Sequence, residues 1–403
     1  MRGTICQVGI GSFRRRLPVR RWAFRTCLVI VVLGASEAAA RVGQRILERR
    51  GVPYSPVFAR ALPTYARDRI ERNLASRGGY FTFDPYTGWT IAAGSTLGPY
   101  CADDLARRDI GAQAGDGPSI AAFGDSFTHG DGVAGSETWT AMLATNGRFV
   151  ANYGVSGFGV DQAFLRYRER EGGLRADVVI IGMMSENVCR HVSSFRPFYT
   201  LDHLAYGKPR FELSGDGLVL VPNPLARRED YERLLSEPAV VLPRLGEHDQ
   251  FYATRPHHRR YDAVAILRFF KTVWAARQAH SPGNRILDGR GCYTESSTAF
   301  AVTARILDVF ASLVRARGAT PIVVLFPTLE DVRRRMTTGV STYGPLASWL
   351  DEHGVEYVDV LPDLCHDDPA RFYRWDGHFS VAGNAVVAAA LETRLRGIAV
   401  RAR

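Results

Sequence analysis

Cysteine is scarce in this chain, and its spacing excludes the familiar cysteine-based sites. The 403 residues contain six cysteines, and no two of them form a C-x-x-C pair. Cys6 and Cys27 belong to the N-terminal segment, so four remain for the body of the chain. Wide spacing among those four defines neither a disulfide pairing nor a zinc motif. The adjacent His257 and His258 lack a third ligand at helical spacing, so we expect solvated loop residues there and no metal.

Net positive charge is nearly absent from most of the chain, although the whole chain carries +10. Residues 1–50 contain eleven arginines and two glutamates, so they carry +9 and leave about +1 for the rest. A basic globular surface is therefore not implied, and nucleic-acid binding loses its main support. Internal repeats and low-complexity tracts are also missing.

An apolar run near the N-terminus follows this arginine-rich stretch. Seven arginines and no acidic residue precede the run Cys27–Ala35, which is the layout of an export signal. Extended to Trp22–Ala40, the run is long enough to span a membrane. Cleavage near Ala38–Ala40 is the alternative, but the helical spacing of residues 41–50 suits a stalk, so we favour a retained anchor. A buried core helix would leave the arginines unexplained.

The chain divides into three parts by pattern. Residues 1–50 form the signal or anchor with its stalk. Residues 51–117 are rich in glycine, proline and aromatic residues without a long helical period, and we expect an irregular lead-in that packs on the main domain. Residues 118–396 form that domain, and an insertion or cap at about 190–295 interrupts it.

The main domain has the pattern of an α/β fold. Five short, almost continuously apolar runs predict buried strands, and helical segments alternate with them. The strands are expected at 120–123, 149–153, 178–182, 321–326 and 355–360, the helices at 138–145, 161–170, 298–317, 346–353 and 381–395, and a hairpin at 211–221. This alternation predicts a three-layer architecture with a central parallel sheet covered by helices on both faces.

Ser126 is the most informative single residue. It follows the apolar run 120–123 and the turn residue Gly124, at a position where a helix could begin. A strand-to-loop junction of this kind exposes a hydroxyl at the end of a sheet, beside free backbone N–H groups. A serine hydroxyl becomes a nucleophile when an imidazole, held by a carboxylate, removes its proton.

The matching base is expected near the other end of the chain. His378 can accept the proton, and Asp376, two residues earlier, can orient the ring. Acyl chemistry also needs donors for the developing oxyanion. The candidates are the Ser126 N–H, the Gly157 N–H and the Asn187 side-chain amide, each shortly after an apolar strand. His129 is close to the nucleophile, and we interpret it as structural or substrate-facing.

These residues together resemble the SGNH, or GDSL-type, hydrolase family. Gly124-Asp125-Ser126 is similar to the family's first block, Asn152 to Gly157 to its second, and Asp376 with His378 to its fifth. The third block, usually Gly-x-Asn-Asp, is matched loosely by 182–187, with longer spacing and without the aspartate. The fifth block is one residue shorter than the common Asp-x-x-His. The resemblance implies a serine nucleophile acting on acyl esters, with no metal or organic cofactor.

The resulting interpretation is an extracytoplasmic serine esterase, anchored in the membrane at its N-terminus. The exported location suggests an O-acetylated carbohydrate of the cell envelope as substrate. An O-acyltransferase acting on a glycan shares the same triad, and the two differ in whether the site excludes water. A non-catalytic envelope binding or assembly protein that retains the fold is a third hypothesis. The loose third block favours it, and the intact serine, aspartate and histidine oppose it.

Overall fold

A computed structural model describes residues 19–50, 52–75, 79–111, 119–200, 204–215, 217–281, 283–396 and 398. Contacts divide the chain into two units. The smaller unit combines Met1–Ser55 with Arg259–Trp274, and the larger one combines Pro56–His258 with Ala275–Arg403. Each unit is described by itself.

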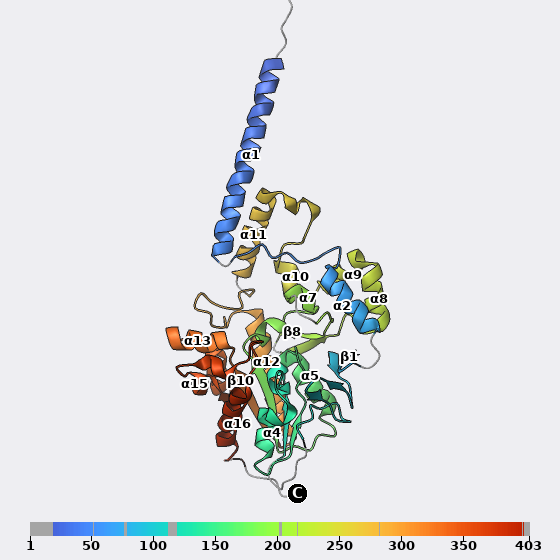
Figure 1. Cartoon of the computed structure of the whole chain (residues 1–403), viewed down its shortest axis with the longest axis vertical. Coiled ribbons are helices and arrows are strands. Elements are labelled where there is room, and N and C mark those ends of the chain that lie inside the picture. Colours follow the sequence, from blue (N-terminus) through green and yellow to red (C-terminus); the bar gives the residue numbers. More distant parts are fainter. Residues whose placement is uncertain are drawn as a thin grey trace, which may run out of the picture. The chain divides into compact units, whose positions relative to one another are not determined.

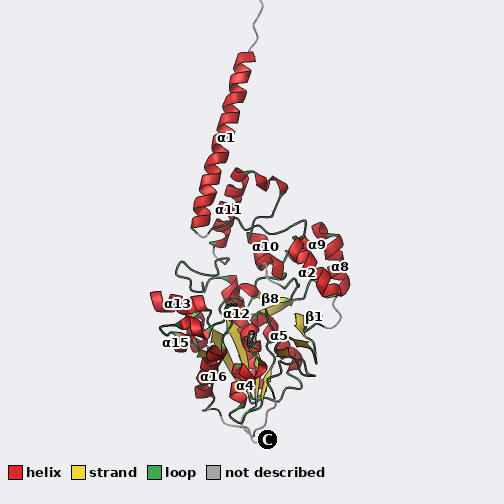
Figure 2. Cartoon of the chain, viewed as in Figure 1, coloured by secondary structure: helices red, strands yellow, loops and turns green. Residues whose placement is uncertain are grey.

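A five-stranded parallel sheet forms the centre of the larger unit, as predicted (Figure 2). All four strand pairings are parallel, in the order β11-β10-β7-β5-β6. The strands are β5 (Ile120–Phe123), β6 (Val150–Asn152), β7 (Val178–Met184), β10 (Thr320–Phe326) and β11 (Tyr357–Asp359). The chain runs from β5 to β6 on one side and then crosses to β7 on the other. The carboxyl ends of these three strands therefore meet where the strand order reverses, which is the usual ligand position in such sheets.

Helices cover both faces of this sheet, so the three-layer architecture is confirmed (Figure 1). Helix α4 (Trp139–Ala144) packs against α16 (Val381–Leu395), while α5 (Val160–Arg170) packs against α12 (Thr298–Ala316). The crossovers through α4 and α5 run in opposite directions along the sheet. Because such crossovers are right-handed, the two pairs lie on opposite faces.

Residues 51–117 are more regular than expected. They contain α2 (Thr64–Ala75) and two small antiparallel hairpins, β1 (Phe81–Asp84) with β2 (Gly88–Ile91) and β3 (Thr96–Leu97) with β4 (Tyr100–Cys101). The helix was hidden in the sequence because only two of its residues, four apart, are buried. The segment does pack on the main domain, where its side chains share a second hydrophobic core with the loop after β6.

The insertion consists of short elements. The predicted hairpin is present as β8 (Arg210–Ser214) and β9 (Gly217–Val221), while the expected turn residue Asp216 lies outside the described residues. The insertion's helices are α6 (Asn187–Arg190), α7 (Arg196–Tyr199), α8 (Arg228–Ser236), α9 (Pro238–Leu245), α10 (Gln250–Thr254), η2 (Arg260–Ala263) and α11 (Ala265–Ala279). The other elements are α3 (Ser126–His129), η1 (Gly135–Glu137), α13 (Leu329–Thr338), α14 (Gly344–Glu352), α15 (Leu361–Leu364) and η3 (Pro369–Phe372).

The N-terminal segment forms one continuous helix, α1 (Val19–Arg49). Its residues Arg21–Arg49 are long and apolar enough to cross a membrane, with a mean hydropathy of 1.6 over the most apolar window. The large apolar side chains from Leu28 to Leu33 are all at least half exposed, so no core formed by the described residues surrounds them. The helix continues beyond the apolar run as far as Arg49.

Candidate active site

Ser126 is the first residue of α3, directly beyond the carboxyl end of β5. Only 5% of its surface is exposed. The junction is tight, since a Cβ atom on Gly124 would lie 2.1 Å from the Thr128 hydroxyl and 2.8 Å from the Gly182 carbonyl oxygen. Glycine at position 124 thus lets α3 begin close to the sheet, which brings the hydroxyl-bearing residue to its edge.

Asp125, beside the nucleophile, is a buried anchor for three segments. Its carboxylate accepts hydrogen bonds from the N–H of Phe127 at 2.9 Å and from the N–H of Met184 at 3.2 Å. The Asn187 amide nitrogen donates to the same carboxylate at 2.5 Å. Burial raises the pKa of Asp125, while Arg190 and these donors oppose the rise. This carboxylate therefore ties the start of α3 to the end of β7.

The Asn187 amide therefore does not point to the place where an oxyanion donor is expected. Its side chain is fully buried, its amide faces Asp125, and it does not line the cavity beside Ser126. The neighbouring Glu186 lines that cavity instead. A direct role for Asn187 in stabilising an oxyanion stays a prediction, and the geometry favours support of the nucleophile loop.

His378 and Asp376 lie on a tight turn that lines the same cavity as Ser126. The turn closes through a hydrogen bond from the Arg374 N–H to the His378 carbonyl oxygen at 2.8 Å, with Gly377 at a φ of +87°. The His378 Nδ1 atom lies 3.5 Å from Oδ1 of Asp376. This separation is longer than a hydrogen bond, and such contacts commonly tighten when substrate binds. The Phe127 ring packs beside the imidazole, with 5.5 Å between centroids.

Two residues with unengaged backbone N–H groups line the same cavity. Ser126 and Gly157 both line it, and among the described residues neither N–H donates to another group. Gly157 has a φ of +80°, and a Cβ atom there would lie 2.2 Å from Leu204. Glycine is therefore required at this position for both conformation and space. The indole nitrogen of Trp89 fixes the loop by donating to the Ser156 carbonyl oxygen at 3.0 Å.

Asp131 is a third carboxylate at the site, and sequence reasoning missed it. Its Oδ2 atom lies 3.9 Å from Nε2 of His378, while Oδ1 is 2.5 Å from Nδ1 of His129 and 2.6 Å from the Ser156 hydroxyl. Burial favours a higher pKa for Asp131, but the interactions with His129, His378 and Ser156 outweigh it and lower that pKa. Asp131 is therefore an anion in the wall of the cavity. The only signal in the sequence was its place in a Gly-Asp-Gly turn five residues after the nucleophile.

His129 supports this carboxylate and does not face the cavity. It is fully buried, and burial lowers its pKa. The Tyr80 hydroxyl is 2.7 Å from His129 Nε2. A neutral ring satisfies both contacts, with Nδ1–H donating to Asp131 and Nε2 accepting from Tyr80. Of the two interpretations offered by the sequence, the structural one fits this geometry.

The cavity has a volume of about 450 Å³ and polar walls. Glu186, Arg190 and Arg196 belong to its lining, with Arg190 3.8 Å from Glu186, and the N-terminus of α13 forms another part. Arg190 and Arg196 help to lower the pKa of Glu186 against the effect of its burial. Charge of both signs therefore surrounds the candidate nucleophile. Among the described residues, no group of three or more histidine, cysteine or acidic side chains is arranged to hold a metal ion.

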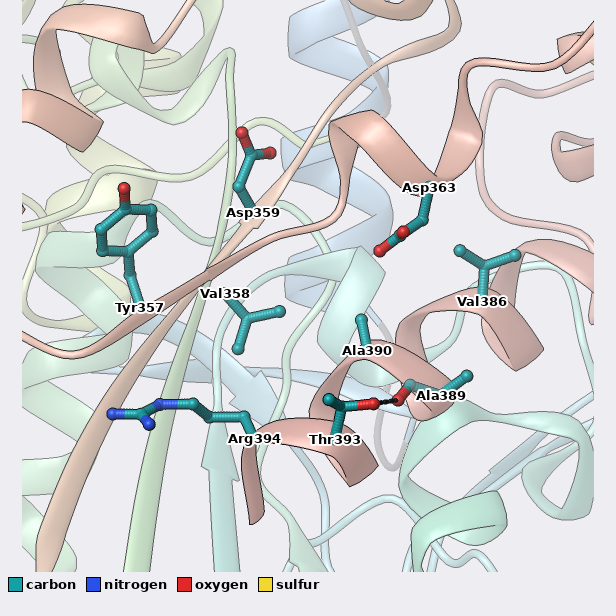
Figure 3. Close-up of a pocket in the computed structure, with 9 residues that line it drawn as sticks. All are labelled: Tyr357, Val358, Asp359, Asp363, Val386, Ala389, Ala390, Thr393 and Arg394. Carbon is teal, nitrogen blue, oxygen red and sulfur yellow. Dashed lines mark hydrogen bonds between the residues drawn. The ribbon is translucent and has the colours of Figure 1, made fainter. Parts of the chain in front are cut away.

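A larger cavity, of about 700 Å³, lies between the edge strand β11 and α16 (Figure 3). Its lining includes Asp359, Asp363 and Arg394 with the apolar side chains of Val358 and Val386. No serine, cysteine or histidine lines it. Volume alone therefore does not locate the chemistry, and the smaller cavity is the candidate active site because it contains the hydroxyl, the imidazole and the carboxylates.

No protein-family model and no curated protein matches the chain. Among solved structures, the chain is similar to a lipolytic protein of the G-D-S-L family from Desulfitobacterium hafniense, with 11% identity and a TM-score of 0.35 over 69% of this chain and 99% of that one. It is also similar to a lipase/acylhydrolase from Enterococcus faecalis, with 13% identity and a TM-score of 0.36 over 71% and 100% of the two chains. A catalytic mutant of an acetylxylan esterase from Geobacillus stearothermophilus shares 18% identity, with a TM-score of 0.35 over 72% and 100%.

Proposed function

We propose that this chain is a serine esterase in which Ser126 attacks the carbonyl carbon of an acyl ester. His378 takes the hydroxyl proton and returns it to the leaving alcohol, and Asp376 orients the imidazole. The N–H groups of Ser126 and Gly157 stabilise the oxyanion. Water then cleaves the acyl-enzyme, with His378 acting again as base.

One observation carries this proposal. Three segments far apart in the sequence, at Ser126, at Gly157 and at Asp376 to His378, line a single cavity at the carboxyl ends of the parallel strands. A hydroxyl, a base, a carboxylate and two unengaged N–H groups are the parts that acyl transfer needs. A binding protein has no need for this combination in one place, so the arrangement favours an enzyme.

We further propose that α1 anchors the protein in a membrane and that the catalytic unit lies outside the cytoplasm. The apolar span and the arginines before it support this orientation. A substrate in the cell envelope, such as an O-acetylated glycan, is consistent with that location. Transfer of the acyl group to a glycan proceeds through the same acyl-enzyme, so the triad serves both outcomes.

Labelling with a fluorophosphonate tests the proposal directly, because the probe reacts with an activated serine. The wild-type chain should be labelled and should hydrolyse a short-chain aryl ester. Ser126→Ala should abolish labelling and lower turnover by several orders of magnitude. His378→Ala should slow both strongly with the nucleophile still present.

Ser236→Ala is the matched control, since Ser236 is exposed on α8 and bonds only to backbone carbonyl oxygens. It should be labelled like the wild type. A folded Ser126→Ala protein with unchanged labelling and turnover would exclude the proposed nucleophile. Unchanged circular dichroism and melting temperature establish that the variants are folded.

A further inference from the structure

Within the smaller unit, the first part of α11 lies beside α1, the proposed membrane anchor (Figure 1). One face of α11 packs on α1, and the other carries exposed apolar side chains. The Glu37 carboxylate of α1 accepts hydrogen bonds from the N–H groups of Ala265 and Ile266, at 2.8 and 3.1 Å. These are the first two residues of α11, so a side chain of the anchor helix caps the N-terminus of α11.

The two helices run alongside each other in the same direction. Phe269 packs so closely on Gly43 that a Cβ atom there would lie 2.7 Å from its ring. Further along, the Thr272 hydroxyl donates to the Gln44 side chain at 3.0 Å, and both residues are buried. Ala265 and Thr272, with Phe269, therefore mark the face of α11 that packs on α1.

The opposite face of α11 is apolar and exposed. Its side chains are between 40% and 63% exposed, and they are Val264, Leu267, Phe270, Val273 and Trp274. With 100° between successive residues, the side of the helix away from Phe269 and Thr272 carries Leu267, Phe270 and Trp274. Val273 lies at the edge of this side, and Val264 directly precedes the helix. Tyr261, in η2, is also half exposed just before the helix. We call these six residues the α11 outer face. Contiguous exposed apolar surface of this kind marks an interaction site.

The position of α11 along α1 indicates what covers the α11 outer face. From Arg21 to Ala40 the helix is about 30 Å long, the thickness of a bilayer's hydrocarbon core. The N-terminus of α11 is level with Glu37, near the end of that span. Phe270 lies only about 8 Å further along its own helix, within the depth of the headgroup region. Tyrosine and tryptophan are the residues enriched at that level.

The charge of the segments around the α11 outer face also suits a lipid surface. The segments 37–55 and 259–274 contain eight basic residues and three acidic ones. Arg41, Arg45 and Arg260 are exposed. Basic side chains flanking an apolar face bind anionic headgroups while the apolar side chains enter the interface. A second protein helix would not need this excess of positive charge.

From these observations we infer that the α11 outer face inserts into the lipid interface of the leaflet where α1 leaves the membrane, and that the neighbouring arginines contact anionic headgroups. The anchor is then a helix pair with two points of attachment. This inference rests on the proposed membrane anchoring of α1, and the experiment separates the two.

The test uses the full chain in nanodiscs of two parts phosphatidylcholine and one part phosphatidylglycerol. All six native cysteines are replaced, Cys6, Cys27 and Cys101 by serine, and Cys189, Cys292 and Cys365 by alanine, so that one introduced cysteine carries an environment-sensitive fluorophore. The reporting position is Phe270→Cys. Ile30→Cys reports on the anchor, and Met336→Cys, 45% exposed on α13 of the larger unit, is the matched control. Lipids with a nitroxide near the headgroup or deep in the acyl chain serve as quenchers.

We expect the shallow quencher to reduce fluorescence at position 270 about threefold more than at position 336. The deep quencher should act most strongly at position 30. Strong quenching at 30 with equal, weak quenching at 270 and 336 would overturn the lipid-facing role of α11 while the anchor stands. A disulfide between two copies at position 270 would assign the face to a second copy. Absent quenching at position 30 would overturn both proposals.

The headgroup contacts have their own readout. Arg260→Gln should reduce shallow quenching at position 270 in discs containing phosphatidylglycerol and should have little effect in discs of phosphatidylcholine alone. Equal behaviour in the two lipids would overturn the proposed role of the arginines.

Discussion

The Nε2 atom of His378 lies 3.9 Å from Oδ2 of Asp131, so the candidate base has a carboxylate on each side of its ring. Asp376 stands near Nδ1, the nitrogen that orients the ring in a serine triad. Asp131 stands near Nε2, the nitrogen that must collect the proton of the nucleophile. An ionised carboxylate there favours the imidazolium that forms during attack.

The first prediction concerns Asp131→Asn, which removes the charge and retains the shape. We expect kcat to fall about tenfold or more, because one unit charge at this distance contributes roughly 1–4 kcal/mol near a protein surface.

Ser156→Ala is the control for the Asp131 prediction, because it removes a hydrogen bond to that carboxylate and leaves the charge in place. It should lower kcat less than Asp131→Asn does. A folded Asp131→Asn enzyme with the wild-type kcat would contradict the electrostatic role.

The sequence predicted the sheet well because four of its five strands are buried on both faces, whereas the edge strand β11 is only partly buried. A strand covered on two sides must be apolar throughout, and such runs stand out at Ile120–Phe123 and Val178–Met184. The motif order around Ser126, Gly157 and His378 also identified three residues that the structure brings to one cavity.

The remaining parts of the site depend on contacts between distant segments. Asp131 gains its role through Tyr80, His129 and Ser156, and nothing in the spacing of these residues predicts that they touch. The direction of the Asn187 amide is likewise a matter of packing, because the same side chain after a strand can face the cavity or the core. Sequence reasoning therefore fails for residues in turns whose contact partners lie far away in the chain.

A second prediction tests what Asn187 does. Its amide is a donor to the buried Asp125 carboxylate, so Asn187→Ala leaves that group short of a partner. We expect the free energy of unfolding to fall by about 2 kcal/mol, together with a fall in kcat. Urea denaturation and steady-state kinetics measure the two effects. A fall in kcat of about 10²–10³ with unchanged stability would instead indicate a direct oxyanion donor.

A third prediction concerns Gly157→Ala. The backbone is in the left-handed region, and the added methyl group meets Leu204 beside the proposed oxyanion donor. We expect activity to fall at least 10²-fold and stability to fall by roughly 1–2 kcal/mol. Gly147→Ala is the matched control, because its φ is +75° and nothing lies within 4 Å of the new atom. It should lose similar stability and keep full activity, and equal activity in the two variants would argue against Gly157 as a donor.

The fourth prediction is a dependence of stability on pH that originates at His191. This residue is fully buried, with Nε2 accepting a hydrogen bond from the Val160 N–H at 3.0 Å and Nδ1 2.6 Å from the Thr303 hydroxyl. Burial lowers its pKa from 6.5 to about 4. Between these two values the unfolded chain binds a proton that the native protein does not.

Stability should therefore fall as the pH drops from 6.5 towards 4, by up to about 1.4 kcal/mol per pH unit from this group. The glutamine of His191→Gln cannot titrate, and its side-chain oxygen can still accept the hydrogen bond from the Val160 N–H. The free energy of unfolding of this variant should therefore change less with pH, by up to about 1.4 kcal/mol per pH unit. Urea denaturation at successive pH values measures both slopes. His280→Gln, at an exposed position on the surface, should keep the wild-type slope. If His191→Gln also kept the wild-type slope, the pH dependence of stability would have to come from other groups. The first of these would be the buried His129, because burial lowers its pKa as well.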